Sequence, residues 1–511
     1  MSNYFHAMFT SGMKEEQNNV INVSGIDANI FSTILNYLYT GKSHLTIFNA
    51  QDLIAAAVYL QIETLISLCE EFLLSNTGTS NCVDVWKLGV TYNCELLKQK
   101  TWIYIVEHFK SIEKPQLLSR LEECEVLNLL HEDNLNSEDE KDILEFVLEW
   151  ITANNCEVDS LKRLIKNVRL PLIDQTSLTK ISHKYEKFRP IIKTALEEQS
   201  NKEDSNLNNP RKEKAFVVLQ RTSYMLGISV ACYSLSKKKW YTLSSNKACS
   251  GGTGYSTCSR NEEIYLSGAK KMYKFSLTEN LWTSLKDMIN GRQCHASGIV
   301  DNSVYVLGGS SSMLNTTMHD FSVVPSIERY NITEDVWEVV GEMENPTYDS
   351  AYATVKTKIF IFGGAIGCIP GVYVKDIQCF DTVSNTCTKI YYNLPFTLSL
   401  ATACTSNNDI YITCPSGQII HFNEESSPTL ISNTKGSQLM GFATVFHDNS
   451  LYIMGGYSVI GETDFIHKFD LNTRKQIRMS NLKLPFTKNT NEYSACAMHV
   501  SRTLLSNNTI V

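Results

Sequence analysis

The stretch Ile359-Phe-Ile-Phe-Gly-Gly364 decides how the second half of this chain is interpreted. A run of β-forming apolar residues that stops at two glycines predicts a short buried strand followed by a bend, because glycine reaches positive φ without steric cost. The same pattern occurs at Val304-Tyr-Val-Leu-Gly-Gly309 and at Leu451-Tyr-Ile-Met-Gly-Gly456. Three copies of one strand pattern indicate that this half of the chain is built from repeats.

Three further segments follow the same pattern less closely. Two of them are Ile264-Tyr-Leu-Ser-Gly268 and Ile410-Tyr-Ile-Thr-Cys414, and Phe216-Val-Val-Leu-Gln220 is a degenerate first copy. From residue 264 onward the copies begin 40 to 55 residues apart. Several short strands repeated at such a period are typical of a β-propeller, in which each repeat forms one blade. Six copies predict six blades.

Most repeats also carry an aromatic residue and then a tryptophan downstream of the glycines. The pairs are Tyr233 and Trp240, Phe275 and Trp282, and Tyr330 and Trp337, whereas Phe380-Asp381 is followed by Cys387 and Phe469-Asp470 by no tryptophan. Large aromatic side chains at a repeated position are expected to fill the space between neighbouring blades.

The end of the chain contains one more strand of this type. Glu492-Tyr-Ser-Ala-Cys-Ala-Met-His-Val500 resembles His295-Ala-Ser-Gly-Ile-Val300, which opens a repeat. A propeller must close its ring, because an open sheet edge would expose unpaired backbone groups. We therefore expect the last strand to complete the first blade.

Residues 1 to about 200 have helical periodicity instead. Three stripes of apolar residues at helical spacing are predicted to face a core: Leu65, Leu68, Cys69 and Phe72; Trp102, Ile105, Val106 and Phe109; and Ile143, Phe146, Val147 and Trp150. Residues 197–214 are polar and charged, and such a segment buries too little area to offset its ordering entropy. We interpret this segment as a solvated linker between two domains.

The composition excludes several classes of protein. The 511 residues hold 46 basic and 54 acidic side chains, a net charge of -8, which argues against a nucleic-acid partner. No run of 18 apolar residues occurs, so no membrane span is expected. The N-terminus lacks the pattern of a secretory signal, and the 15 cysteines form no Cys-x-x-Cys pair. We therefore expect free thiols and a cytoplasmic location.

The sequence also offers no catalytic or cofactor motif. The histidines occur singly, and no metalloprotease, hydrolase or phosphate-loop pattern is found. Gly251-Gly252-Thr253-Gly254 is glycine-rich, but no lysine follows it, and it is interpreted as a turn. We expect a non-catalytic protein without a metal or organic cofactor.

Several motifs resemble known families. Residues 215–505 are similar to a Kelch propeller, and Ser2–Glu15 with Tyr37–Gly41 closely resembles a BTB domain. The motifs that resemble a BACK domain are Asn81-Cys82, Glu132–Leu135, Phe146–Ile151 and Val168–Leu172. This order is that of the Kelch-like adaptor family. The resemblance implies a multidomain chain: an α/β partial BTB domain (1–76), an all-α BACK domain (77–196), a linker (197–214) and an all-β six-bladed Kelch propeller (215–505).

The family resemblance implies a substrate-recruiting adaptor of a cullin-3 ubiquitin ligase, with an unidentified protein target. Met13 and Glu15 match the hydrophobic-x-acidic motif that would contact cullin-3, and a helix pair around Val83 to Phe109 would extend that contact. The alternative for the motif is that Met13 packs at a helix end and Glu15 is a solvated charge.

One departure from the family concerns the start of the chain. A BTB domain normally begins several tens of residues before the Tyr4-Phe5 element, with the segment that builds a homodimer. Its absence weakens the expectation of a homodimer. It also leaves open a second function, a cytoskeletal or regulatory scaffold whose BTB domain recruits no ligase. Asn- and Ile-rich segments and degenerate repeats are similar to virus-encoded members of the family, which act on host ligases.

The candidate contacts to the target lie at one end of the propeller, where loops converge. They are Arg292, His295 and Tyr348, and the alternative is that each is an ordinary loop residue. Insertions at Ser310–Pro325 and Ala365–Lys375 are expected to enlarge the mouth or rim of the propeller.

Overall fold

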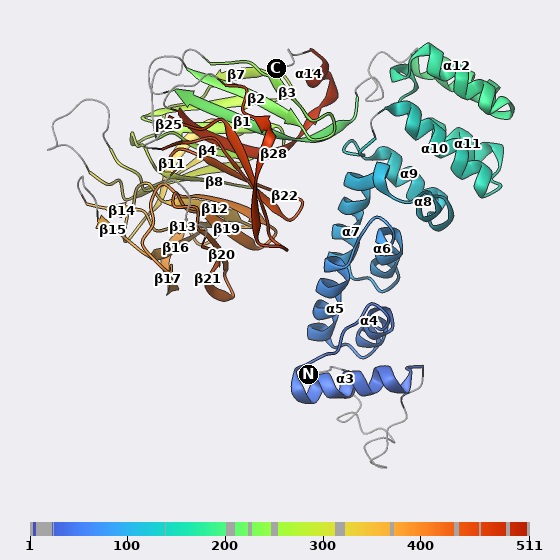
Figure 1. Cartoon of the computed structure of the whole chain (residues 1–511), viewed down its shortest axis with the longest axis horizontal. Coiled ribbons are helices and arrows are strands. Elements are labelled where there is room, and N and C mark those ends of the chain that lie inside the picture. The colour runs from blue at the N-terminus through green and yellow to red at the C-terminus, as the bar shows by residue number, and fades with distance from the viewer. Residues whose placement is uncertain are drawn as a thin grey trace. The chain divides into compact units, whose positions relative to one another are not determined.

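The computed structural model divides the chain into two compact units, Met1–Lys212 and Glu213–Val511. The first consists of helices and the second of antiparallel sheets (Figure 1). The structure describes residues 4–6, 23, 25–137, 139–200, 210–222, 227–246, 254–311, 322–367, 372–433, 439–458, 461–486 and 491–507.

The regular elements described before Lys212 are all helices. They are α3 (Ala28–Thr40), α4 (Ala50–Tyr59), α5 (Glu63–Ser75), α6 (Cys82–Thr91), α7 (Glu95–His108), α8 (Lys114–Arg120), α9 (Glu123–His131), α10 (Glu140–Ala153), α11 (Val158–Ile165), α12 (Gln175–Lys184) and α13 (Arg189–Ser200), with short 3-10 turns at Phe109–Ser111, Leu170–Leu172 and Glu186–Phe188. The α/β character expected for the BTB part therefore has no counterpart among these described residues.

Local sequence signals fix the ends of α3. Asp27 caps its N-terminus by accepting a hydrogen bond from the Asn29 backbone N–H at 2.8 Å. Gly41 ends it in the left-handed conformation, with φ 71°, and donates its N–H to the Tyr37 carbonyl. The apolar face between these caps buries Ile30 and Ile34 in the core of the first helices.

The predicted helical stripes largely form the core. The α10 stripe, Ile143, Phe146, Val147 and Trp150, is buried as predicted, and so are Ile105, Val106 and Phe109 of α7. Trp102 differs, because it is only partly buried at the edge of this core. A half-buried tryptophan on an otherwise buried stripe indicates that one side of α7 lines an open space.

The predicted linker contains more structure than its composition suggests. Helix α13 continues to Ser200, and strand β1 begins at Lys212. Arg211 is buried rather than solvated, and its guanidinium pairs with Glu140 at 3.0 Å. The same guanidinium donates to the carbonyls of Leu130 and Glu132, which explains how a charge is accommodated inside a helical unit.

The second unit consists of six four-stranded antiparallel sheets, so the prediction of a six-bladed propeller is confirmed. The blades are, in order, β28 (Asn491–Ser501) with β1 (Lys212–Thr222), β2 (Ile228–Ser234) and β3 (Lys239–Thr242); β4 (Ser256–Arg260), β5 (Glu263–Gly268), β6 (Lys271–Ser276) and β7 (Leu281–Ser284); β8 (Ala296–Val300), β9 (Ser303–Leu307), β10 (Ser326–Asn331) and β11 (Val336–Glu342); β12 (Ala351–Val355), β13 (Lys358–Phe362), β16 (Asp376–Asp381) and β17 (Thr386–Asn393); β18 (Thr402–Ser406), β19 (Asp409–Thr413), β20 (Ile419–Asn423) and β21 (Ser426–Ser432); and β22 (Ala443–His447), β23 (Ser450–Met454), β26 (Phe465–Asp470) and β27 (Lys475–Lys483).

Two small ribbons and a terminal helix complete the second unit. The ribbons are β14 (Ala365–Ile366) with β15 (Val372–Tyr373), and β24 (Tyr457–Ser458) with β25 (Gly461–Glu462); the helix is α14 (Arg502–Asn507). Each ribbon joins the second and third strands of its blade.

The glycine pairs and the aromatic pairs have the predicted roles. Gly308 and Gly309 both have positive φ, and a Cβ on Gly309 would lie 2.6 Å from the Gln293 carbonyl oxygen, so only glycine fits there. Tyr330 and Trp337 face each other across β10 and β11, with ring centroids 5.2 Å apart. The Trp337 indole donates to the Lys286 carbonyl in the preceding blade connection, which ties adjacent blades together.

The last strand closes the ring as expected. β28 takes the outermost place in the first sheet, next to β1, and contacts β22 of the sixth blade. The first strands of successive blades contact one another from β4 through β8, β12, β18 and β22 in the same way. Val500 and Met498 of β28 are buried against Val217 and Leu219 of β1 in one core cluster.

This closure predicts a large stability effect of a small change in β28. Val500→Ala should lower the free energy of unfolding of the propeller by about 2 kcal/mol, because it leaves a cavity beside a closing strand. Urea unfolding of the full chain, followed by tryptophan fluorescence, measures the difference. Val383→Ala is the matched control, because Val383 is 76% exposed, and it should change stability little. Equal effects of the two substitutions would contradict the closing role of β28.

Candidate functional site

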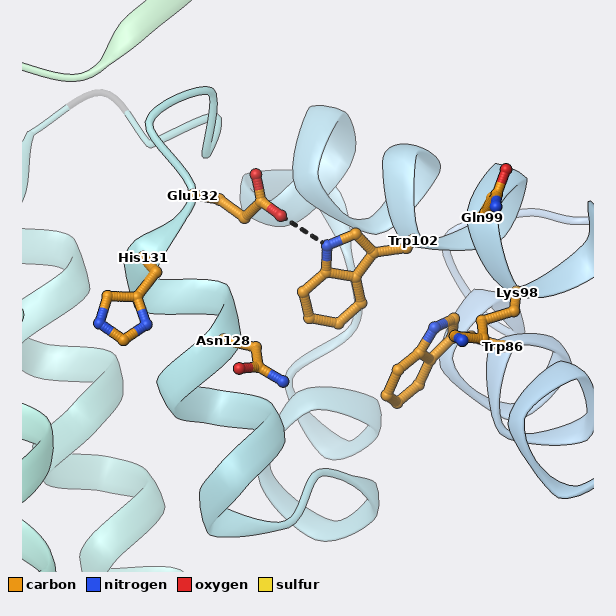
Figure 2. A pocket seen from close by; sticks show the side chains of 7 residues that line it. All are labelled: Trp86, Lys98, Gln99, Trp102, Asn128, His131 and Glu132. Atoms are coloured by element: carbon orange, nitrogen blue, oxygen red, sulfur yellow. Dashed lines mark hydrogen bonds between the residues drawn. The ribbon is translucent and has the colours of Figure 1, made fainter. Parts of the chain in front are cut away.

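An open pocket of about 410 Å³ lies on the helical unit between α6, α7 and α9. Its lining residues, drawn in Figure 2, are Trp86, Lys98, Gln99, Trp102, Asn128, His131 and Glu132. The pocket explains why Trp102 is only partly buried, since its indole forms one wall. Sequence reasoning placed Trp102 in the core and missed the pocket, because a stripe at helical spacing does not show which of its ends remains open.

Two indoles form the apolar wall of the pocket. The rings of Trp86 and Trp102 lie with centroids 5.0 Å apart at an angle of 40°. Glu132 points toward Trp102 in Figure 2 and accepts a hydrogen bond from the indole Nε1 at 2.8 Å. The backbone carbonyl of Glu132 accepts from the Arg211 guanidinium at 2.7 Å. Both bonds hold the Glu132 carboxylate in one orientation at the pocket.

The cations near the pocket have partners of their own. Lys98 pairs with Glu95 at 3.1 Å on the outer face of α7. Lys87 lies 5.7 Å from the Trp86 ring and pairs with Glu125 at 2.6 Å. The pocket thus combines aromatic faces, amide groups and one carboxylate, a set that binds a side chain but contains no nucleophile paired with a base.

A second surface of the helical unit is apolar and exposed. Phe48 is 95% exposed and Ile47 is 71% exposed, in the turn that precedes α4. The turn is fixed by two hydrogen bonds of the Asn49 side chain, one from the Thr46 N–H and one to the His44 carbonyl, both at 2.8 Å. Large apolar side chains held out in water by an ordered turn mark a contact surface.

The two residues predicted to bind cullin-3, Met13 and Glu15, lie outside the described residues. The helix pair predicted to extend that contact does form, as α6 and α7. It exposes Val90, Leu96 and Ile103, each more than two fifths accessible.

The three predicted target contacts in the propeller are all buried, and this corrects their assignment as surface residues. Arg292 pairs with the equally buried Glu328 at 2.5 Å and donates to the Ser326 carbonyl at 2.7 Å. The His295 ring shares a 2.8 Å hydrogen bond with the Ser267 hydroxyl. Burial, and then the Arg292 charge, hold the pKa of His295 well below its usual value, so the ring is neutral.

Tyr348 is buried because its backbone pairs with Ala365, at the base of the β14–β15 ribbon. The ribbon itself carries exposed side chains instead, those of Ile366, Val372 and Tyr373. The signal in the sequence was the insertion at Ala365–Lys375, which was expected to enlarge the rim. The described part of the other insertion, Ser310–Pro325, pairs Ser310 with Val323.

The cysteines are chemically quiet. The 13 that the structure describes are free thiols, and burial raises the pKa of Cys258, Cys404 and Cys496 to about 12. A thiol with so high a pKa is protonated at neutral pH and is a weak nucleophile. Within the described ranges, no three His, Cys, Asp or Glu side chains gather as a metal site. No helix within those ranges is long and apolar enough to cross a bilayer.

Family comparisons agree with the two halves of this fold. The BTB/POZ domain matches residues 1–77, the "BTB And C-terminal Kelch" domain (BACK) matches 82–183, and the Kelch motif matches 291–344 and 346–390. The chain is therefore a BTB-BACK-Kelch protein: a helical BTB-BACK region followed by a six-bladed propeller.

Its curated relatives are Kelch-like proteins. The chain is 25% identical over 401 residues to human Kelch repeat and BTB domain-containing protein 12, covering 71% of this chain and 63% of the relative. It is 24% identical over 387 residues to human Kelch-like protein 25, covering 71% and 65%. It is 24% identical over 489 residues to Kelch-like protein 38 of Rattus norvegicus, covering 89% and 81%. The matches to the first two relatives span less than two thirds of their length.

The buried Arg292–Glu328 pair leads to a prediction that separates structure from target binding. Arg292→Met should lower the free energy of unfolding of the propeller by about 3 to 5 kcal/mol, because it leaves the Glu328 charge buried without its partner. Thermal unfolding of the full chain provides the measurement.

Arg329→Met is the matched control in the same strand. Arg329 pairs with Glu338, but both side chains are about a third to a half exposed, so the loss should be about 1 kcal/mol or less. A stable Arg292→Met variant would show that Arg292 has no structural role.

Proposed function

We propose that this protein is a non-catalytic, substrate-recruiting adaptor of a cullin-3 RING ubiquitin ligase. In this proposal the BTB-BACK region binds cullin-3 and the propeller binds the target protein. The domain order and the Kelch-like relatives support the general class. The single observation that carries the proposal is the exposed apolar turn at Ile47 and Phe48 in the BTB region.

The turn has the properties of an interface anchor. Phe48 is nearly fully exposed, and the Asn49 side chain holds the turn from both sides, so little conformational entropy is lost when a partner covers it. A rigid aromatic side chain entering a partner's pocket is typical of the few residues that dominate binding energy. Met13 and Glu15 would add the hydrophobic-x-acidic contact, and Leu96 and Ile103 of α7 would extend the surface into the BACK domain.

The propeller offers a different kind of surface for the target. The β14–β15 ribbon exposes Val372 and Tyr373, and its base is fixed by the paired backbones of Ala365 and Tyr348. We propose this ribbon, in place of the buried Arg292, His295 and Tyr348, as the part of the rim that contacts the target. The free thiols are consistent with a cytoplasmic location for the complex.

The cullin-3 proposal predicts that Phe48→Ala weakens binding without unfolding the protein. Loss of an interface anchor costs about 2 kcal/mol or more, which corresponds to an increase of at least about tenfold in the dissociation constant for cullin-3. Because the side chain is exposed, the Tm should stay within about a degree of the wild type. Biolayer interferometry with the purified N-terminal region of cullin-3 measures the affinity.

Tyr391→Ala in β17 is the matched control, since Tyr391 is an aromatic residue of the propeller that is 93% exposed, and its substitution should leave cullin-3 binding unchanged. The double variant Met13→Ala/Glu15→Ala tests the motif separately. If the wild-type chain fails to bind cullin-3, the adaptor proposal is wrong and the scaffold alternative gains support.

A further inference from the structure

The helical unit contains one carboxylate that the rest of the fold does not neutralise. Residues 121–135 carry five acidic side chains and no lysine or arginine. Four of the five pair with cations from other helices: Glu122 and Glu125 with Lys87, Glu123 with Arg163, and Asp133 with Arg169. The fifth is Glu132, which has no cation partner in the part of the chain that the structure describes.

We propose that the pocket between α6, α7 and α9 is a receptor site for the guanidinium group of an arginine on a partner segment. Glu132 is partly buried at the pocket wall, and its Oε1 is already occupied by the Trp102 indole. Its second carboxylate oxygen remains available to an incoming donor. A guanidinium supplies N–H donors to such a carboxylate and at the same time stacks on an indole face.

The pocket is organised for this ligand before it binds. Trp102 and Arg211 hold the side chain and the backbone of Glu132, respectively, and Trp86 packs against Trp102. Asn128 lies across from the two indoles in Figure 2, where its amide oxygen can accept a further N–H. A carboxylate fixed beside aromatic faces favours a planar cation over a neutral side chain, because little reorganisation is needed on binding.

An acidic ligand is the competing possibility, since Lys98 and His131 also line the pocket. Lys98 is already paired with Glu95. His131 is exposed at the C-terminal end of α9. An anion would also have to approach the unneutralised Glu132 carboxylate. The charge balance therefore favours a cation.

The site is distinct from the exposed turn at Phe48, so it does not rest on the cullin-3 proposal. Either can fail without the other, because the probe for the pocket is a short peptide and needs no ligase component.

The experiment uses the full chain labelled with 5-fluorotryptophan and followed by 19F NMR. The chain has six tryptophans, and the signals of Trp86 and Trp102 are assigned with the single Trp→Phe variants. The probes are acetyl-Gly-Arg-Gly-amide, its citrulline analogue, which has nearly the same shape without the charge, and acetyl-Gly-Glu-Gly-amide. We expect the arginine peptide alone to shift the Trp86 and Trp102 signals in a saturable manner.

Glu132→Gln is the decisive variant, because its amide oxygen can still accept from the Trp102 indole while the charge is lost. The arginine peptide should bind it about tenfold more weakly, with the resting Trp102 signal and the Tm unchanged. Glu198→Gln on α13 removes the same charge from an exposed position and should bind like the wild type. The proposal is overturned if the glutamate or citrulline peptide binds as well as the arginine peptide, if Glu132→Gln binds it normally, or if no probe shifts the two signals.

Discussion

The pairing of β28 with β1 is the constraint on which the propeller depends. Residues about 280 positions apart share one sheet, as the contact between the Cys496 thiol and the Val217 carbonyl shows. Until that sheet forms, β1 and the first strand of the sixth blade both have an unpaired or uncovered face. The ring therefore cannot be assembled blade by blade to full stability, and the final strand makes the other five sheets a single cooperative body.

Closure also explains why charged residues lie inside the propeller. Loops before the first strands are joined from blade to blade by backbone hydrogen bonds, from Cys294 to Gly254 and from Asp349 to Cys294. Such joined loops leave little water between blades, so polar side chains there must bind one another. Arg292 and Glu328 satisfy this requirement with a buried ion pair. The rim of the propeller is thus a rigid frame, and exposure is confined to inserted elements such as the β14–β15 ribbon.

The sequence predicted what depends on neighbouring residues and missed what depends on distant partners. The glycine pair at Gly308-Gly309 and the Tyr330–Trp337 pair lie within single blades, so their pattern was visible, and blade number and closure followed from it. Arg292 was predicted at the surface because its partner Glu328 lies 36 residues away. Trp102 was predicted in the core for a similar reason: its partner Glu132, 30 residues away, marks a pocket that one helix cannot reveal.

The two units present binding groups by the same physical means. In the helical unit, Asn49 fixes the turn that exposes Phe48, and in the propeller, the paired backbones of Tyr348 and Ala365 fix the ribbon that exposes Tyr373. In both cases polar groups next to the exposed side chain are already hydrogen-bonded within the protein. A partner therefore has to cover only apolar surface, and it neither breaks a hydrogen bond nor orders a loop. An adaptor that performs no chemistry gains affinity in this way, since its binding energy is not spent on its own rearrangement.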